Sequence, residues 1–130
     1  MDRKLADSLK NLERAQANFE DALKLPPEQD LVKEGTIHRF ETLLEVFWKT
    51  LQRALEYEGL QVYTPRNCVK EAFRLGWISD EALWLSILDL RNVTSHEYLD
   101  DALAEANYLE VKRLGSVLGN ASQFLIARYA

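Results

Sequence analysis

Apolar residues recur along most of this chain at intervals of three and four positions, separated by polar residues. This spacing places the apolar side chains on one face of an α-helix and predicts helices packed through that face. The pattern is clearest over residues 3–24, where Gln16 interrupts a narrow stripe, and over residues 30–58, where the stripe is broader. The apolar positions are Leu5, Leu9, Leu12, Phe19 and Leu23, followed by Ile37, Phe40, Leu43, Leu44, Val46, Phe47, Trp48, Leu51 and Leu55.

Residues that begin or end helices separate these segments. Pro26 and Pro27 should end the first helix, because a proline ring removes a backbone donor and restricts the preceding residue. Gly59 should end the second helix. Two later helices are predicted from their capping residues: a short one from Thr64-Pro65 to Leu75, ended by Gly76, and one that begins at Ser79-Asp80-Glu81.

A last helix is predicted over residues 100–128, with two glycines inside it. Gly115 and Gly119 each cost about 1 kcal/mol relative to alanine in a helix interior, so we expect another backbone to pass close to them. We also expect the pair to permit close packing between two copies of the chain. The apolar positions of this helix are Leu103, Tyr108, Val111, Leu114, Leu118, Ala121 and Leu125.

The chain shows no alternation of period two and no hairpin signal, so strands are not expected. The predicted fold is all-α: a single domain over residues 1–130, built as an up-and-down antiparallel bundle of about five helices. With 47% hydrophobic residues, three tryptophans and five phenylalanines, the chain has enough apolar material for a sizeable core.

Charge and composition narrow the classes of function. The net charge of −5 argues against broad binding to nucleic acid or to an anionic membrane, so any nucleic-acid contact must be local. The N-terminus is charged, and no apolar run approaches the ~18 residues of a membrane span, which favours a cytoplasmic protein with no membrane association. A single cysteine, Cys68, excludes an internal disulfide.

Familiar catalytic motifs do not occur. The sequence has no glycine-rich phosphate loop and no paired-aspartate motif after a strand, so it is not expected to be a nucleotidyltransferase itself. A serine elbow and a Cys/His dyad are also missing, and we expect neither a metal nor a cofactor. His38 has no cysteine or carboxylate cluster at ligand spacing and is interpreted as structural.

The remaining candidate chemistry lies at the end of the fourth predicted helix, within residues 83–98. Apolar positions Leu83, Trp84, Ile87, Leu88 and Leu90 give way there to Arg91, Asn92, Thr94, Ser95, His96 and Tyr98. An ordinary helix end is one interpretation, because a cation suits the C-terminal end of the helix dipole. The other is a phosphodiester site in which His96 moves a proton, Arg91 holds a phosphate and Asn92 orients either group.

Helical geometry restricts the second interpretation. Positions five apart are separated by about 140° around a helix, so Arg91 and His96 converge only if the helix ends between them or a second subunit contributes. Thr94-Ser95 is a credible place for such an end. We therefore predict a homodimer whose interface includes residues 79–98.

The whole chain resembles the nucleotidyltransferase substrate-binding protein family, a branch of the HEPN superfamily of helical proteins. The similar stretches are residues 37–51, 64–78 and 83–98. Arg91, four intervening residues and His96 match the RNase motif of the superfamily, and Tyr98 stands where toxin-type members carry a tyrosine. The resemblance implies metal-independent RNA cleavage by a dimer, in a toxin-antitoxin-like module whose minimal nucleotidyltransferase partner adenylylates Tyr98.

Two alternatives stay open. In the first, the chain is a non-catalytic substrate-binding subunit of a two-component nucleotidyltransferase, and Arg91 and His96 hold a nucleotide ligand. The acidic balance, without a basic stripe interleaved with aromatic residues, favours this alternative over RNA binding. In the second, Arg91 and His96 are dimer-interface residues and Tyr98 packs beside Leu99.

Overall fold

A computed structural model describes residues 2–94 and 101–130 of the chain, with the side chains of residues 92–94 and 101 left out. These residues form five α-helices: α1 (Arg3–Leu23), α2 (Val32–Tyr57), α3 (Pro65–Arg74), α4 (Glu81–Thr94) and α5 (Asp101–Arg128). No strand occurs in the two described ranges. The all-α class and the number of helices predicted from the sequence are confirmed.

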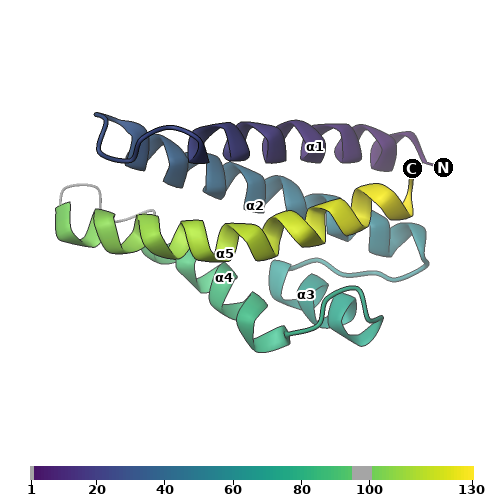
Figure 1. Cartoon of the computed structure of the whole chain (residues 1–130). Coiled ribbons are helices and arrows are strands. Elements are labelled where there is room, and N and C mark those ends of the chain that lie inside the picture. Colours follow the sequence, from purple (N-terminus) through teal and green to yellow (C-terminus); the bar gives the residue numbers. More distant parts are fainter. Residues whose placement is uncertain (1, 95–100) are drawn as a thin grey trace.

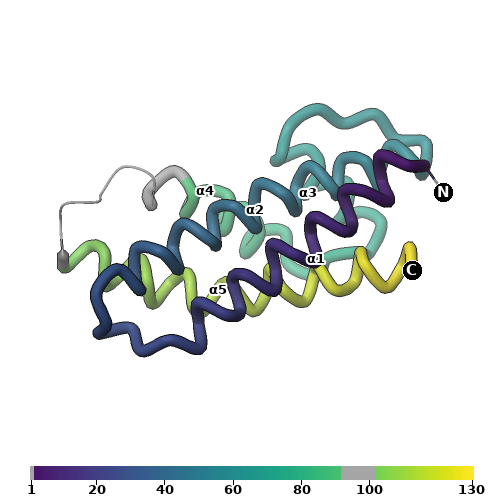
Figure 2. The backbone as a smooth tube through the Cα atoms, turned by 90° about the horizontal axis from the view of Figure 1, so that it is seen from above, coloured from purple at the N-terminus to yellow at the C-terminus, as the bar shows by residue number. Residues whose placement is uncertain are grey.

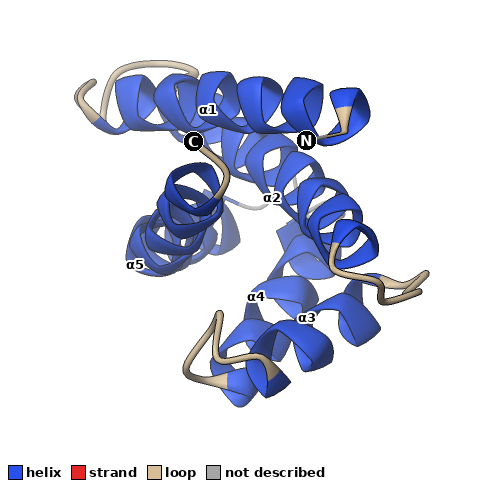
Figure 3. Ribbon diagram, turned by 90° about the vertical axis from the view of Figure 1, so that its right-hand side faces the viewer, coloured by secondary structure: helices blue, strands red, loops and turns tan. Residues whose placement is uncertain are grey.

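Helix α2 lies at the centre of the bundle and contacts α1, α3 and α5 (Figures 1 and 2). Helices α1, α2, α4 and α5 alternate in direction along the chain, so that the start of α1 and the end of α5 lie at the same end of the molecule. The short α3 packs between α2 and α4, on the side of α2 away from α1 (Figure 3). Contact between α4 and α5 is sparse. The predicted up-and-down arrangement is therefore confirmed.

The core is built on the broad apolar face of α2, as the periodicity predicts. Phe40 and Phe47 are almost completely buried on this face. Phe40 lies against Phe19 of α1, with ring centroids 6.0 Å apart, and Phe47 stacks on Trp84 of α4 at 5.0 Å. Aromatic contacts from one helix thus connect the N-terminal helix to the helix that carries the candidate site.

Most helix boundaries follow the predicted capping chemistry. The Thr64 hydroxyl accepts a hydrogen bond from the backbone N–H of Asn67 at 3.2 Å, and Pro65 occupies the first turn of α3. Asp80 caps α4 by accepting from the N–H of Leu83 at 3.0 Å. Gly59 and Gly76 follow α2 and α3 with φ angles of 91° and 78°, the left-handed conformation that favours glycine.

The cap at the start of α2 could not be predicted from the sequence. The helix begins at Val32, and its N-cap is Leu31, which has a left-handed φ of 68° and makes no side-chain capping hydrogen bond. Leu31 is the single non-glycine residue with positive φ in the described ranges, and it is 69% exposed. Leucine carries none of the side-chain chemistry that signals a cap, so the sequence gives no warning of this conformation.

The glycine pair of α5 contacts α1 of the same chain. A Cβ at Gly115 would lie 2.5 Å from two ring atoms of Phe19, and one at Gly119 would lie 3.3 Å from Nε2 of Gln16. Gln16 donates to the carbonyl of Gly119 at 3.3 Å and accepts from Gln123 at 3.1 Å. The prediction of close helix packing is confirmed, but using these glycines to support a homodimer is wrong, because α1 already covers them.

Candidate functional site

Arg91 lies in the last turn of α4, and its side chain reaches across to α2. Its Nη2 atom is 3.0 Å from Oε2 of Glu45, and the side chain is 45% exposed. The guanidinium therefore meets a carboxylate and is also partly open to solvent. A guanidinium has five N–H donors in a planar fork, so it can contact more than one acceptor at a time.

The carboxylate of Glu45 is held in its charged form. Partial burial raises its pKa, but the Trp48 indole, Lys49 and Arg91 together outweigh this effect and lower the pKa below its ordinary value. The Lys49 ammonium lies 3.2 Å from Oε1 of Glu45. Oε2 of Glu45 and Nε1 of Trp48 are both buried. A buried carboxylate oxygen and a buried indole N–H group thus accompany Arg91.

Arg91 also lines a groove of about 440 Å³ between α2, the start of α3 and α4. Its walls combine apolar side chains with charged and amide groups. The lining residues are Leu44 and Trp48 of α2, Thr64, Pro65, Arg66, Asn67 and Lys70 around α3, and Leu88, Asp89 and Arg91 of α4. The volume lies within the ~300–1,000 Å³ typical of small-ligand sites.

Two more cations enter this groove from α3. Arg66 and Lys70 are four residues apart and therefore share one face of that helix. Arg66 forms an ion pair with Asp89 of α4, with Nη2 and Oδ1 2.9 Å apart. Sequence reasoning missed this cluster of basic residues around Trp48, because its members come from α3 and α4 and meet only where these helices pack beside α2. The i, i+4 spacing of Arg66 and Lys70 is the one signal that was available.

The other predicted site residues cannot be placed beside Arg91. Asn92 lies in the last turn of α4, but its side chain is outside the described set, and His96 and Tyr98 lie outside the described residues altogether. The convergence of Arg91 and His96 therefore stays a prediction. The described part of α4 ends at Thr94, before the position expected for His96.

Other reactive groups do not form a second site in the described part of the chain. Cys68 is buried, and this burial, with a smaller contribution from Glu56, raises the pKa of its thiol to about 11, so the thiolate nucleophile is disfavoured at neutral pH. His38 is exposed on α2, and no three metal-ligating side chains cluster among the described residues. Within the same residues, no helix has the length and apolarity needed to cross a membrane.

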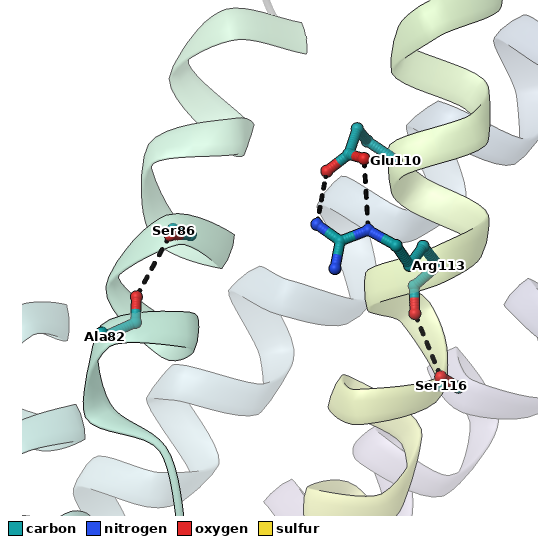
Figure 4. Close-up of polar contacts among 5 residues, drawn as sticks. All are labelled: Ala82, Ser86, Glu110, Arg113 and Ser116. Carbon is teal, nitrogen blue, oxygen red and sulfur yellow. Dashed lines mark hydrogen bonds and ion pairs between the residues drawn. The ribbon is translucent and has the colours of Figure 1, made fainter.

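The polar contacts of α4 and α5 that Figure 4 draws each remain within one helix. Arg113 donates to both carboxylate oxygens of Glu110, at 2.8 and 3.2 Å, and its carbonyl accepts from Ser116. On α4, the hydroxyl of Ser86 donates to the carbonyl of Ala82 at 3.1 Å. These residues therefore do not link α4 to α5; α4 instead packs against α3 and, through the stacked rings of Phe47 and Trp84, against α2.

Comparison with known proteins gives a consistent result. A family described as nucleotidyltransferase substrate binding protein like matches residues 7–115. A Haemophilus influenzae protein named probable ribonuclease HepT is 31% identical over 97 residues, covering 62% of this chain and 66% of that relative, just under two thirds of its length.

Two solved structures also share the fold. A Thermus thermophilus protein has a TM-score of 0.75 and 28% identity, covering 90% of this chain and 97% of its own. A Haemophilus influenzae protein, described as having the fold of a substrate-binding domain of a nucleotidyltransferase, has a TM-score of 0.63 and 28% identity, covering 95% and 94%. The chain belongs to the nucleotidyltransferase substrate-binding protein-like family.

Proposed function

We propose that this chain is the HEPN-type component of a two-protein, toxin-antitoxin-like module with a minimal nucleotidyltransferase, and that it cleaves RNA without a metal. The observation that carries the proposal is Arg91: it begins the Arg-x4-His pattern and lies at the edge of a polar groove in a chain similar to a probable ribonuclease. The proposed catalytic residues are Arg91, Asn92 and His96.

The proposed reaction uses the 2′-hydroxyl of the RNA. His96 removes the proton of this hydroxyl, whose oxygen attacks the adjacent phosphorus as the bond to the 5′-oxygen breaks. A protonated histidine donates to the departing 5′-oxygen, and Arg91 stabilises the negative charge on the phosphate. One His96 must serve both proton transfers unless a homodimer supplies two. The proposal therefore includes a homodimer. Its mass measured by sedimentation should exceed the 15.0 kDa of one chain.

The deciding experiment is RNA cleavage by the purified protein in EDTA. Wild type should cut RNA, whereas His96→Ala and Arg91→Ala should each lose at least a hundredfold in rate. His38→Ala is the matched control, because it removes the other histidine from an exposed position on α2. Circular dichroism should show unchanged helicity in all three variants. Activity retained in His96→Ala would assign the chemistry to other residues.

Control by the partner completes the proposal. A cytoplasmic nucleotidyltransferase would transfer the AMP group of ATP to the phenol oxygen of Tyr98, two residues beyond His96, with release of pyrophosphate and of the phenol proton. The added phosphate would compete with RNA for Arg91 and His96, and would inhibit cleavage without a change of fold.

The alternative function is a non-catalytic substrate-binding subunit of a two-component nucleotidyltransferase. The resemblance to a solved substrate-binding domain supports it, as does the net charge of −5. This alternative predicts nucleotide binding by the chain and no RNA cleavage, with or without EDTA. The cleavage assay therefore separates the two functions.

A further inference from the structure

We propose that the groove formed by Trp48, Arg66, Asn67 and Lys70 beside Arg91 binds one nucleoside monophosphate unit, either free or as part of a single-stranded RNA. The phosphate would lie between Lys70 and Arg66, and the base against Trp48. This inference deepens the proposed function and rests on it only for the RNA form of the ligand.

The charges of the groove suit a ligand with little negative charge. Among the residues that line the groove, Arg66, Lys70 and Arg91 bring three positive charges and Asp89 brings one negative charge, so the excess is two positive charges. A phosphate monoester carries about two negative charges at neutral pH and a phosphodiester carries one, so neither exceeds this excess. A more strongly charged ligand such as a polyphosphate or an acidic peptide segment would exceed it and would meet the carboxylate of Asp89.

The cations are available to a phosphate. Lys70 is exposed and forms no ion pair with any described residue. Arg66 is paired with Asp89, but these side chains are 57% and 61% exposed, and exposed ion pairs contribute little to stability. A phosphate can therefore recruit Arg66 without a large penalty. Lys70 and Arg66 reach the groove from one face of α3 and can hold neighbouring oxygens of one phosphate.

The opposite wall suits a nucleobase. Trp48 is partly buried, and Leu44 and Leu88 line the same groove, which gives the indole an apolar surround. Aromatic rings that line a positively charged groove are stacking platforms for bases, and they tolerate any sequence. Asn67 is exposed beside this wall, and its amide offers both a donor and an acceptor to the edge of a base.

The test measures binding of 5′-AMP and of a labelled single-stranded RNA oligonucleotide to the full chain, by calorimetry and by fluorescence anisotropy. Lys70→Ala should weaken binding about tenfold, the loss expected for one charge-assisted phosphate contact. Trp48→Phe should weaken binding less, because a smaller ring remains. Lys10→Ala, which removes an exposed lysine of α1, is the matched control and should leave both affinities within about twofold.

The proposed groove is supported if either probe binds and if Lys70→Ala selectively weakens that binding. Binding of AMP alone would identify the ligand as a free nucleotide, and binding of RNA alone would identify it as a single strand. The proposal is overturned if wild type binds neither probe, or if Lys70→Ala and Lys10→Ala bind alike. Cleavage measured on the same variants separates this proposal from the proposed function. If wild type binds AMP but cuts no RNA, the proposed nuclease function is wrong and the nucleotide-binding groove is supported. If Lys70→Ala leaves both cleavage and RNA affinity unchanged, the proposed groove is wrong and the nuclease function is unaffected.

Discussion

Gly115 of α5 lies against the edge of the Phe19 ring in α1: a Cβ at Gly115 would be 2.5 Å from both Cε2 and Cζ of that ring. Phe19 is 2% exposed and its ring also lies against Phe40, so it has little room to move. The missing side chain of Gly115 therefore sets the distance between the first and last helices.

Gly115→Ala should lower the free energy of unfolding by about 1 kcal/mol. Alanine gains about 1 kcal/mol in helix propensity over glycine, but overpacking a tight core contact costs about 1–3 kcal/mol, and the second effect should win. Urea denaturation followed by circular dichroism measures the difference.

Gly35→Ala provides the matched control, because Gly35 lies in α2 and nothing approaches its Cβ position within 4 Å. This variant should gain about 0.5–1 kcal/mol from helix propensity alone. Adding Phe19→Leu to Gly115→Ala should recover part of the loss, since the smaller side chain removes the overlap. Equal stabilisation by both glycine substitutions would mean that the ring yields and that the contact is not tight.

The same glycines show what periodicity can and cannot establish. Their position inside a helical pattern predicts close packing, because glycine is costly there without a reason. A period of 3.6 gives the buried face of a helix but not the helix that covers it. The partner is α1, through Phe19 and Gln16, and not a second copy of the chain.

The candidate site also contains residues that the sequence could indicate and residues that only the packing of the helices brings together. Arg91 could be found from the sequence, because the apolar pattern of α4 stops there and the residue matches a family motif. Glu45, Arg66 and Lys70 could not, because they approach Arg91 only when α2, α3 and α4 pack together. The chain therefore has no basic stripe in sequence, although it has a basic groove in space.

Leu31 is the clearest local departure from sequence expectations, and it offers a stability test. Leu31→Asn should raise the free energy of unfolding by about 1 kcal/mol, because a left-handed conformation costs a leucine about 1–2 kcal/mol and asparagine tolerates it better. Leu25→Asn is the control: Leu25 is also an exposed leucine of the α1–α2 connection, at 49%, without positive φ. Thermal unfolding that rises in Leu25→Asn as much as in Leu31→Asn would attribute the gain to lost surface hydrophobicity.

Tyr98 is expected to accept AMP when the chain is produced together with its nucleotidyltransferase. Intact-mass measurement should then find an adduct with the mass of AMP on wild type, and RNA cleavage by the modified protein should fall at least tenfold. Tyr98→Phe should carry no adduct. Tyr63→Phe is the control, since Tyr63 is 71% exposed and therefore available to a nonspecific transferase. If Tyr98→Phe keeps the adduct, another residue is the acceptor.

Glu45 should make the stability of the chain sensitive to acid. Burial opposes ionisation, but Trp48, Lys49 and Arg91 lower the pKa of Glu45 in the folded protein below its ordinary value. The stabilisation is therefore fully present above the ordinary glutamate pKa and is lost as the pH falls through the lowered one. Because the partners are partly exposed, its size should be about 0.5–1 kcal/mol.

Glu45→Gln should remove this contribution, so the free energies of unfolding of variant and wild type should differ at pH 7 and converge in acid. Glu13→Gln, which changes an exposed glutamate of α1 that has no ion pair in the described ranges, should follow wild type throughout.

The same Glu45→Gln variant tests the arginine, because losing a carboxylate 3.0 Å away leaves Arg91 more available to a phosphate. RNA affinity should therefore rise as stability falls. A parallel fall in both would mean that Glu45 orients Arg91 for its ligand and does not compete with that ligand.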